Sequence, residues 1–285
     1  MDYDRIDWNH TWKHQIRLWH DAAGKSCEDI WGDENSARVY AEKHGKHNEK
    51  RINQTLDYLN ITSDFKVLDI GAGPGNIAIP MAQVAHSVTT VEPSHGMNAV
   101  MEKEMVEKEI SNLVRIEKKW EEVDPDKDLN GPYDIVLASM SLGMENIKIS
   151  LEKMSRVCSG RVVIFWHAGT PEWEKMPKAL WPNLFGKAYH GGPKSDVLFQ
   201  VLYQMGIYPE VKAFKYHFTE VFPDLDNAAD FYYRRFKQLT PEHRPQLLDY
   251  LKKECGKTDK GYVHGFDHQT MRFSWEPKEV RHEVA

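Results

Sequence analysis

Val67-Leu68-Asp69-Ile70-Gly71-Ala72-Gly73-Pro74-Gly75-Asn76 is the stretch that decides the fold of this 285-residue chain. Its apolar residues predict a buried strand, and its three glycines predict a sharp turn that a ligand can approach without meeting a Cβ atom. The helix expected next, Asn76–Val84, presents free N–H groups and the positive end of its dipole to the loop. A strand, a glycine loop and a helix in this order indicate a cofactor site of the nucleotide type.

Two acidic residues narrow the choice of cofactor. The glycine spacing is G-x-G-x-G, not the G-x-G-x-x-G of dinucleotide sites. Asp69 lies at the carboxyl end of the expected strand, where a carboxylate repels a pyrophosphate and attracts a cationic ligand. Glu92 ends a second expected strand, Ser87–Glu92, where it can accept hydrogen bonds from the hydroxyls of a ribose. A ribose joined to a cationic amino acid describes S-adenosylmethionine better than NAD.

At these residues the chain resembles the class I S-adenosylmethionine-dependent methyltransferases. The resemblance rests on Val67–Asn76, on Val91-Glu92-Pro93-Ser94 and on Tyr133-Asp134-Ile135-Val136-Leu137-Ala138, and it is best over residues 60–170. It implies S-adenosyl-L-methionine as the cofactor. The cofactor-binding residues expected on this basis are Asp69, Gly71, Ala72, Gly73, Asn76, Glu92, Pro93, Trp120, Glu121 and Ser139.

The resemblance also implies separate roles for some of these residues. Gly71 and Gly73 line the methionine part, Asp69 lies near its amino group, and Glu92 holds the ribose. The segment Lys119-Trp120-Glu121-Glu122 covers the adenine, although many members have an aspartate there. For Trp120 the alternative is packing in the hydrophobic core, which is common for tryptophan.

Strands and helices alternate through the central part of the chain, which predicts a doubly wound, mostly parallel α/β sheet. Two later strands bring the sheet to seven, and the resemblance implies that the last one runs antiparallel. The expected strands are Lys66–Ile70, Ser87–Glu92, Asn112–Glu117, Tyr133–Ser139, Gly160–His167, Glu210–Phe218 and Tyr262–Trp275, with helices Asn76–Val84, Gly96–Lys108 and Ile147–Cys158 between the first five.

The flanks predict helical caps around this Rossmann-like core. We expect an N-terminal helical cap at residues 1–60 and a methyltransferase domain at 61–285, with substrate-capping insertions at 171–194 and 222–260. Within these segments the expected helices include Ser36–Tyr40, Leu225–Leu239 and Pro241–Cys255, the last with Thr240 as its N-cap. In the first cap Trp8, Trp12 and Trp19 recur at helical spacing. Trp31 and Tyr40 are candidates to touch the cofactor or the substrate.

Composition limits the class of protein. The net charge of −6 argues against a nucleic-acid substrate, and the chain lacks both an apolar run long enough for a membrane span and an apolar signal segment near Met1. Its three cysteines, at positions 27, 158 and 255, form no C-x-x-C pair, which is typical of a cytoplasmic protein without disulfides. No metal site is expected: His264 and His268 lie too far apart on a strand, and His44 with His47 has no third ligand.

The chemistry of the reaction limits what motifs can reveal. A sulfonium donor is already activated, so positioning of the acceptor supplies much of the catalysis, with a general base in some enzymes. His167, at the end of the fifth strand, is the candidate base, and a structural histidine is the alternative. The segment Ala138-Ser139-Met140-Ser141 lacks the Asn/Asp-Pro-Pro-Tyr/Phe run of certain amine-methylating family members.

The sequence therefore predicts methyl transfer to a small or medium-sized molecule. A protein or RNA methyltransferase and a non-catalytic S-adenosylmethionine-binding protein stay open as alternatives, and a nicotinamide-dependent oxidoreductase is a more distant one. The methyl acceptor and the oligomeric state are not predicted.

Overall fold

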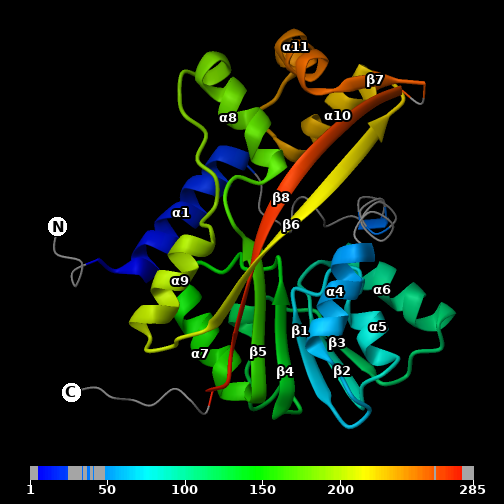
Figure 1. The fold of residues 1–285 in the computed structure, drawn as a ribbon, viewed down its shortest axis with the longest axis vertical. Helices are drawn as coiled ribbons and strands as arrows, with labels where there is room; N and C mark the ends of the chain where they lie inside the picture. The colour runs from blue at the N-terminus through cyan, green and yellow to red at the C-terminus, as the bar shows by residue number, and fades with distance from the viewer. Residues whose placement is uncertain are drawn as a thin grey trace.

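The computed structural model describes residues 6–24, 34, 37–38, 41, 49–259 and 261–277. Figure 1 shows a twisted sheet with helices on both faces and a helical layer beyond one end. The strands are β1 Lys66–Ile70, β2 Ser87–Val91, β3 Leu113–Ile116, β4 Tyr133–Ser139, β5 Cys158–His167, β6 Glu210–Phe222, β7 Gly256–Thr258 and β8 Gly261–Trp275. The helices are α1 Trp8–Ala23, α4 Glu49–Leu59, α5 Ala78–Ala82, α6 His95–Glu107, α7 Ile147–Val157, α8 Glu172–Phe185, α9 Ser195–Gln204, α10 Leu225–Arg235 and α11 Arg244–Glu254.

The sheet has the order β3-β2-β1-β4-β5-β8-β6. The strands β1 to β5 pair in parallel, while β8 runs antiparallel to both β5 and β6. The predicted seven-stranded, mostly parallel and doubly wound sheet is therefore confirmed, including the antiparallel last strand. The short β7, which pairs with β8, was not predicted, because its three residues are exposed and give no hydrophobic pattern.

The parallel strands are buried on both faces, and alternate residues enter two different hydrophobic layers. Val67, Ile135 and Val163 pack with residues of α4, α5 and α6. Leu68 and Val136, one position along, pack instead with residues of α1, α7 and α9. This division fixes which face of the sheet each polar residue at a strand end occupies.

The helix α1 confirms the predicted helical tryptophan spacing. It begins after Asp7, whose side chain accepts a hydrogen bond from the His10 N–H at 2.9 Å, and it ends at Gly24 in the left-handed region. Trp12 is completely buried and donates its indole N–H to the Met144 carbonyl at 2.8 Å. This hydrogen bond ties α1 to the loop that follows β4.

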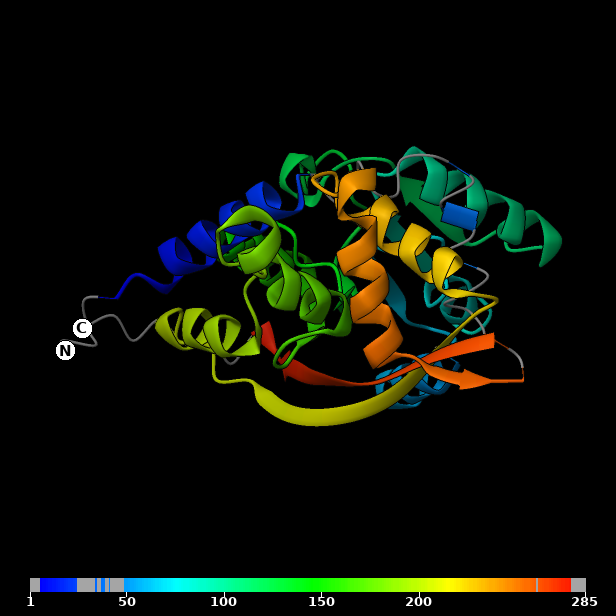
Figure 2. The ribbon, with the colours of Figure 1, turned by 90° about the horizontal axis from the view of Figure 1, so that it is seen from above.

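The strands β6 and β8 continue well beyond the parallel core. They stay paired from Glu210 opposite Ser274 to Phe222 opposite Tyr262, so β6 is longer than predicted. Figures 1 and 2 show these two strands leaving the sheet and curving alongside α10 and α11. The segments 171–194 and 222–260 supply α8, α10, α11 and β7, which gather at this end of the molecule.

Helix ends depart from the sequence predictions at several places. The helix α10 ends at Arg235 and not at Leu239, and Pro241–His243 forms a 3₁₀ turn before α11. Thr240 caps this turn, as predicted, in a reciprocal arrangement with His243. The helix α5 is shorter than predicted because the glycine loop continues up to Ile77.

Several predictions lie outside the described residues. These concern a helix at Ser36–Tyr40, apart from its residues 37 and 38, the ligand contacts of Trp31 and Tyr40, Cys27, and the pair His44 and His47. None of the helices in the described ranges combines the length and the apolar composition that a membrane span requires.

Candidate functional site

The glycine loop after β1 adopts the conformation that the sequence predicts. Gly71 has φ +70°, and a Cβ atom on it would lie 2.3 Å from the Cβ atom of Ser141, so the loops after β1 and β4 are in close contact. Gly73 has φ +58°, and a Cβ atom there would meet nothing within 4 Å. The loop therefore combines one glycine required by packing with another that faces open space.

Glu92 follows β2 and holds this loop in place. Its two carboxylate oxygens accept hydrogen bonds from the backbone N–H groups of Gly73 and Ser94, each at 2.9 Å. The residue is only 8% exposed. These hydrogen bonds fix the carboxylate beside the glycine loop, where the sequence predicts that it holds a ribose hydroxyl.

Asp69 is buried at the end of β1, with 2% of its surface exposed. Burial, followed by the negative charge of Glu92, raises the pKa of its carboxyl group from 3.8 to about 7, although Arg51 acts in the opposite direction. The ionised carboxylate is therefore poorly solvated. A cation placed beside it would relieve this cost, which fits the ammonium group that the sequence analysis assigned to Asp69.

Arg51 is a further candidate site residue, which the sequence pattern did not predict. It lies on α4, is half-buried, and donates through Nη1 to the hydroxyl of Ser139 at 2.9 Å. Within the described ranges it forms no ion pair with a carboxylate. Helical spacing could have identified it, because Thr55 and Leu59, four and eight residues later, are buried on the same face of α4.

The end of β4 is held in an uncommon backbone conformation. Met140 has φ +60°, which is costly for a residue other than glycine and occurs often near functional sites. Its neighbours fix it: Ser139 binds Arg51, and the Ser141 hydroxyl donates to the Ile70 carbonyl at 2.5 Å. This turn faces the glycine loop across the strand ends.

His167 ends β5 and pairs with a second histidine. Its Nδ1 lies 3.1 Å from Nε2 of His268 on β8, and Trp173 of α8 packs edge-on against its ring. Burial, then the interactions with His268, Lys194 and Arg51, keep the pKa of His167 well below its usual 6.5. Burial, Arg51 and Lys194 lower the pKa of His268 to about 4, against the opposing effect of Glu172. Both rings are therefore neutral at physiological pH.

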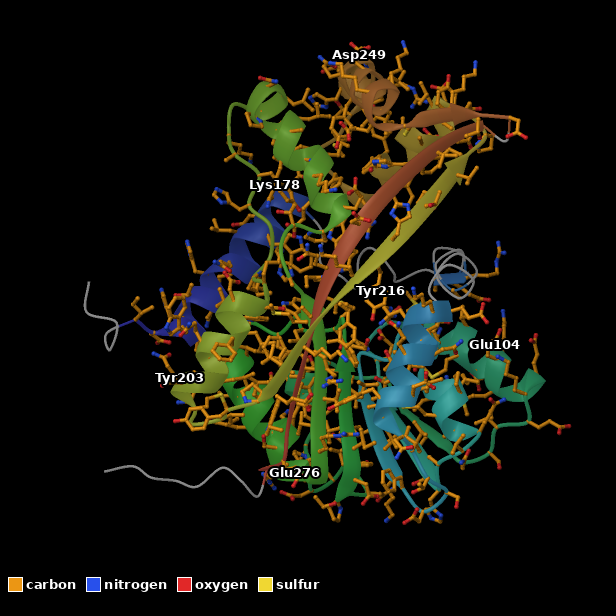
Figure 3. All side chains as sticks on the ribbon, in the orientation of Figure 1. Glu104, Lys178, Tyr203, Tyr216, Asp249 and Glu276 are labelled. Atoms are coloured by element: carbon orange, nitrogen blue, oxygen red, sulfur yellow. The ribbon has the colours of Figure 1, made fainter. Side chains whose placement is uncertain are left out.

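The residues at the strand ends share one face of the sheet. Asp69, Ser139 and His167 alternate with residues of the opposite layer, so all three lie on the side of α4. On the antiparallel strands, Tyr216 lies opposite His268, two positions from the residue that pairs with His167. Figure 3 shows Tyr216 where β6 passes the end of α4 and leaves the core.

The predicted adenine contact of Trp120 is not supported by its environment. The indole is 2% exposed, donates its N–H to the Ser150 carbonyl at 3.2 Å, and has the Lys153 ammonium 4.9 Å from its ring centre. These are the surroundings of a core residue, the alternative given above. Glu121 beside it is exposed. Of the other predicted residues, Ala72, Asn76 and Pro93 are half-buried at the glycine loop and after β2.

The remaining histidines of interest lie in different environments. His264 is buried and lies 3.1 Å from a carboxylate oxygen of Glu172, and His190 is exposed. No cluster of three or more histidine, cysteine or acidic side chains suited to a metal ion occurs in the described part of the chain.

Parts of this chain are similar in sequence to known proteins. Residues 40–163 match a family model described as "Methyltransferase domain". An uncharacterized protein of Haemophilus influenzae is 28% identical over 154 residues, which are 54% of this chain and 55% of that protein. The 23S rRNA (uracil(1939)-C(5))-methyltransferase RlmD of Enterobacter sp. is 35% identical over 68 residues, which are 24% of this chain and 15% of that enzyme. The matched region thus spans about half the length of the first relative and much less of the second.

Solved structures share the fold at low sequence identity. A proposed methyltransferase of Bacillus halodurans C-125 has a TM-score of 0.56 and 13% identity, with 78% of this chain and 96% of that chain covered. The YcgJ protein of Bacillus subtilis has a TM-score of 0.55 and 14% identity, with 79% and 97% covered. These likenesses show a common overall fold.

Proposed function

We propose that this chain is a class I S-adenosylmethionine-dependent methyltransferase that transfers a methyl group to a small or medium-sized molecule. The match of residues 40–163 to a family model described as "Methyltransferase domain" supports this proposal. One observation carries the proposal. A buried carboxylate, Asp69, and a cationic side chain that forms no ion pair with a carboxylate in the described ranges, Arg51, lie on the same face of the sheet at the ends of β1 and β4.

Different residues of the site fit the different parts of the cofactor. The amino acid portion of S-adenosylmethionine carries an ammonium and a carboxylate, which match the charges of Asp69 and Arg51. In this proposal the Glu92 carboxylate, held beside the glycine loop, accepts hydrogen bonds from the ribose hydroxyls, and the open side of Gly73 leaves room for a ligand. When bound, the cofactor supplies a methyl group that its sulfonium already activates.

The proposed acceptor side uses the ends of β4 and β5. Ser139 and His167 lie there on the same sheet face as Asp69, and Trp173 of α8 covers the histidine pair. In this proposal residues 171–194 and 222–260 enclose the acceptor, and residues 1–60 form the N-terminal helical cap. Enclosure by aromatic helices and a net charge of −6 both favour a small molecule over a nucleic acid.

Calorimetric titration of the purified protein tests the cofactor assignment. We expect binding of S-adenosylmethionine and S-adenosylhomocysteine, no binding of NADH, and weaker binding of both sulfur ligands in Asp69→Asn and Arg51→Gln. The matched controls are Asp57→Asn and Lys50→Gln, which change exposed residues on α4. Binding of NADH alone, or equal binding by all variants, contradicts the proposal.

A labelled methyl donor tests the class of substrate. Protein, extract fractions and labelled S-adenosylmethionine are incubated, and the products are separated by size. Label in small molecules supports the proposal. Label in RNA or protein supports the macromolecular alternative, and tight binding without transfer to any fraction supports a non-catalytic protein.

A further inference from the structure

The strand β6 forms a long open edge of the sheet. Its 13 residues pair with β8 on one side, and on the other side they pair with no strand in the described part of the chain. Figure 2 shows β6 along one margin of the molecule. The opposite edge strand, β3, has only four residues. An open row of N–H and C=O groups can bind another strand, so natural edge strands are usually short or interrupted.

Nothing interrupts β6 between its ends. Its pairing with β8 keeps one register from Glu210 to Phe222, so the strand contains no bulge, and Pro209 and Pro223 lie just outside it. Bulges and prolines within a strand are common means by which an edge is kept from pairing. The outer edge of β6 therefore has the backbone geometry to bind a further strand along its length.

Exposed apolar side chains gather around this edge. Of the nine large apolar side chains that are exposed in the described ranges, five lie on α9, on β6 or between them: Phe199, Tyr203, Tyr208, Val211 and Val221. The first three form an aromatic patch, because the ring centre of Tyr203 is 6.4 Å from that of Phe199 and 5.3 Å from that of Tyr208. Figure 3 shows Tyr203 where α9 leads into β6. Such a concentration of exposed apolar groups is typical of an interaction surface.

A second copy of β6 matches this edge in both charge and hydrophobicity. In an antiparallel pair of identical strands, a two-fold axis places facing side chains on the same side of the sheet. With Tyr216 at the axis, Lys212 faces Glu220 of the second copy. In the same register Val211 faces Val221 of the second copy, and both valines are exposed. Symmetry repeats each contact, so two pairs of opposite charge and two pairs of valines meet across the axis.

A shifted register brings like charges together. With Lys215 at the axis, two lysines face each other and Glu210 faces Glu220. In the register described above, Lys215 instead faces His217, whose Nδ1 lies 2.9 Å from a carboxylate oxygen of Asp267. Lysines on an edge strand normally oppose pairing, but in this register each lysine of β6 meets a negative group.

We propose that β6 pairs with β6 of a second copy of this chain, antiparallel and with Tyr216 facing Tyr216, to give a two-fold symmetric dimer with one continuous sheet. Backbone hydrogen bonds along the two strands hold the dimer together, and the facing side chains select the register. The aromatic patch of each copy lies beside the end of β6 in the other copy, near the exposed Val221. This inference does not depend on the proposed function, because it concerns the edge of the sheet and not the strand ends.

Sedimentation of the full chain over a range of concentrations is the first test. We expect a dimer at micromolar concentration. Lys212→Glu and Glu220→Lys should each weaken it at least about tenfold, because like charges then face each other twice, and the double variant should restore it. The control Lys187→Glu makes the same charge change at an exposed residue after α8 and leaves the dimer unchanged. A monomer at all concentrations, or a double variant as weak as the single ones, overturns the proposal.

A matched pair of valine substitutions tests the apolar part of the interface. We expect Val211→Lys on β6 to weaken the dimer about tenfold, because two charges then face the valines of the other copy. Val114→Lys is the control, since Val114 is exposed on the opposite edge strand β3. Thermal unfolding checks that each variant is folded. An equal effect of the two substitutions, or no effect of Val211→Lys, overturns the proposal.

Disulfide cross-linking tests the register. Within one copy Val211 and Val221 are ten residues apart on one strand, about 33 Å, so cysteines there cannot bridge inside a chain. Val211→Cys with Val221→Cys, in a Cys27→Ser background, should give a covalent dimer on oxidation. Val211→Cys with Thr219→Cys, which matches the register centred on Lys215, should not. Cross-linking of the second pair alone, or of neither pair, overturns the proposal.

Hydrogen exchange distinguishes strand pairing from association through another face. The amides of β6 should exchange more slowly in the dimer than in Lys212→Glu at the same concentration, whereas those of β3 should exchange equally. A dimer in which β6 exchanges as fast as in the monomer overturns the proposal. A monomer that instead binds a different protein along β6 also overturns it, since the partner is then not a second copy of this chain.

Discussion

The parallel core and the β6–β8 extension use the same kind of strand in different surroundings. In β4 five of seven residues are buried, because helices cover both faces. In β6 most residues are exposed. The exposed side chains include charged or polar ones, as is common on an edge strand: Lys212, Lys215 and His217. The core therefore fixes Asp69 and His167 rigidly, whereas the extension supplies His268 and carries the helices near the site on a narrower support.

The first prediction concerns the hydrophobic cluster of those helices. Trp181 is completely buried among Phe185, Tyr189 and Phe236. We expect Trp181→Ala to destabilise this layer by about 3–5 kcal/mol, because truncation leaves a large cavity. Hydrogen exchange should then speed up in α8, α10 and α11 while β1 and β4 stay protected. Equal acceleration in β1 and β4 would mean that the two regions unfold as one unit.

The second prediction concerns the stability that the core loses because Asp69 is buried. The raised pKa of Asp69 corresponds to ~4 kcal/mol of destabilisation above pH 7, since the folded state must then hold a buried charge. Stability from the bound proton is complete below pH 3.8 and is lost as the pH rises through about 7. Asp69→Asn should therefore raise the free energy of unfolding by about 1–3 kcal/mol near pH 8 and by less near pH 5. The gain is smaller than ~4 kcal/mol because the buried amide group lacks a full set of hydrogen-bond partners.

The same substitution should weaken S-adenosylmethionine binding by about 100-fold, because a charged hydrogen bond to the ammonium is lost. Thermal unfolding at both pH values and calorimetric titration measure the two effects, with Asp57→Asn as the control. Unchanged binding, or lower stability near pH 8, contradicts the prediction.

A third prediction follows from the same pKa and concerns binding alone. A cationic ligand binds the ionised form of Asp69, so the protein must release a proton to bind it below the pKa. We expect the affinity for S-adenosylmethionine to be constant well above pH 7 and to fall up to about tenfold per pH unit below it. Asp69→Asn should remove this slope, and a slope that persists in the variant would assign the titration to another group.

The smallest expected effect lies on the surface of the extension. Arg244 of α11 binds Asp226 at 2.7 Å and Asp230 at 3.1 Å on α10, and all three side chains are in contact with solvent. We expect Arg244→Gln to lower the unfolding temperature by under about 2 °C, and the difference to vanish in about 1 M salt. A large drop that salt does not affect would show that packing of the arginine stem, and not its charge, joins the two helices.

Local sequence patterns predicted the core closely and the extension less well. The bounds of β1 and β4 were predicted to the residue, since each strand is a short apolar run ended by a polar residue or a glycine. The strand β6 was predicted four residues too short, because on an edge strand solvent faces many positions and the alternation is weak. The helix α10 was predicted too long, because the apolar residues after Arg235 pack in the cluster without being helical.

The site shows the same division. Gly71, Gly73, Asp69 and Glu92 lie within or next to the first two strands and the glycine loop, so local sequence patterns were enough to propose them as candidate site residues. Arg51 was not predicted, because its contact with Ser139 exists only when α4 lies over the end of β4.

The sequence by itself determined the fold class of the core: a doubly wound sheet with a glycine loop after β1 and an acidic residue at the end of β1 and after β2. It did so because strand and loop signals act over a few residues. Only the tertiary structure decided that Trp120 packs in the core, that Arg51 binds Ser139, and that His167 meets His268, which is 101 residues away. Such contacts depend on strand order and on the pairing of β5 with β8, which long-range packing of the whole chain determines.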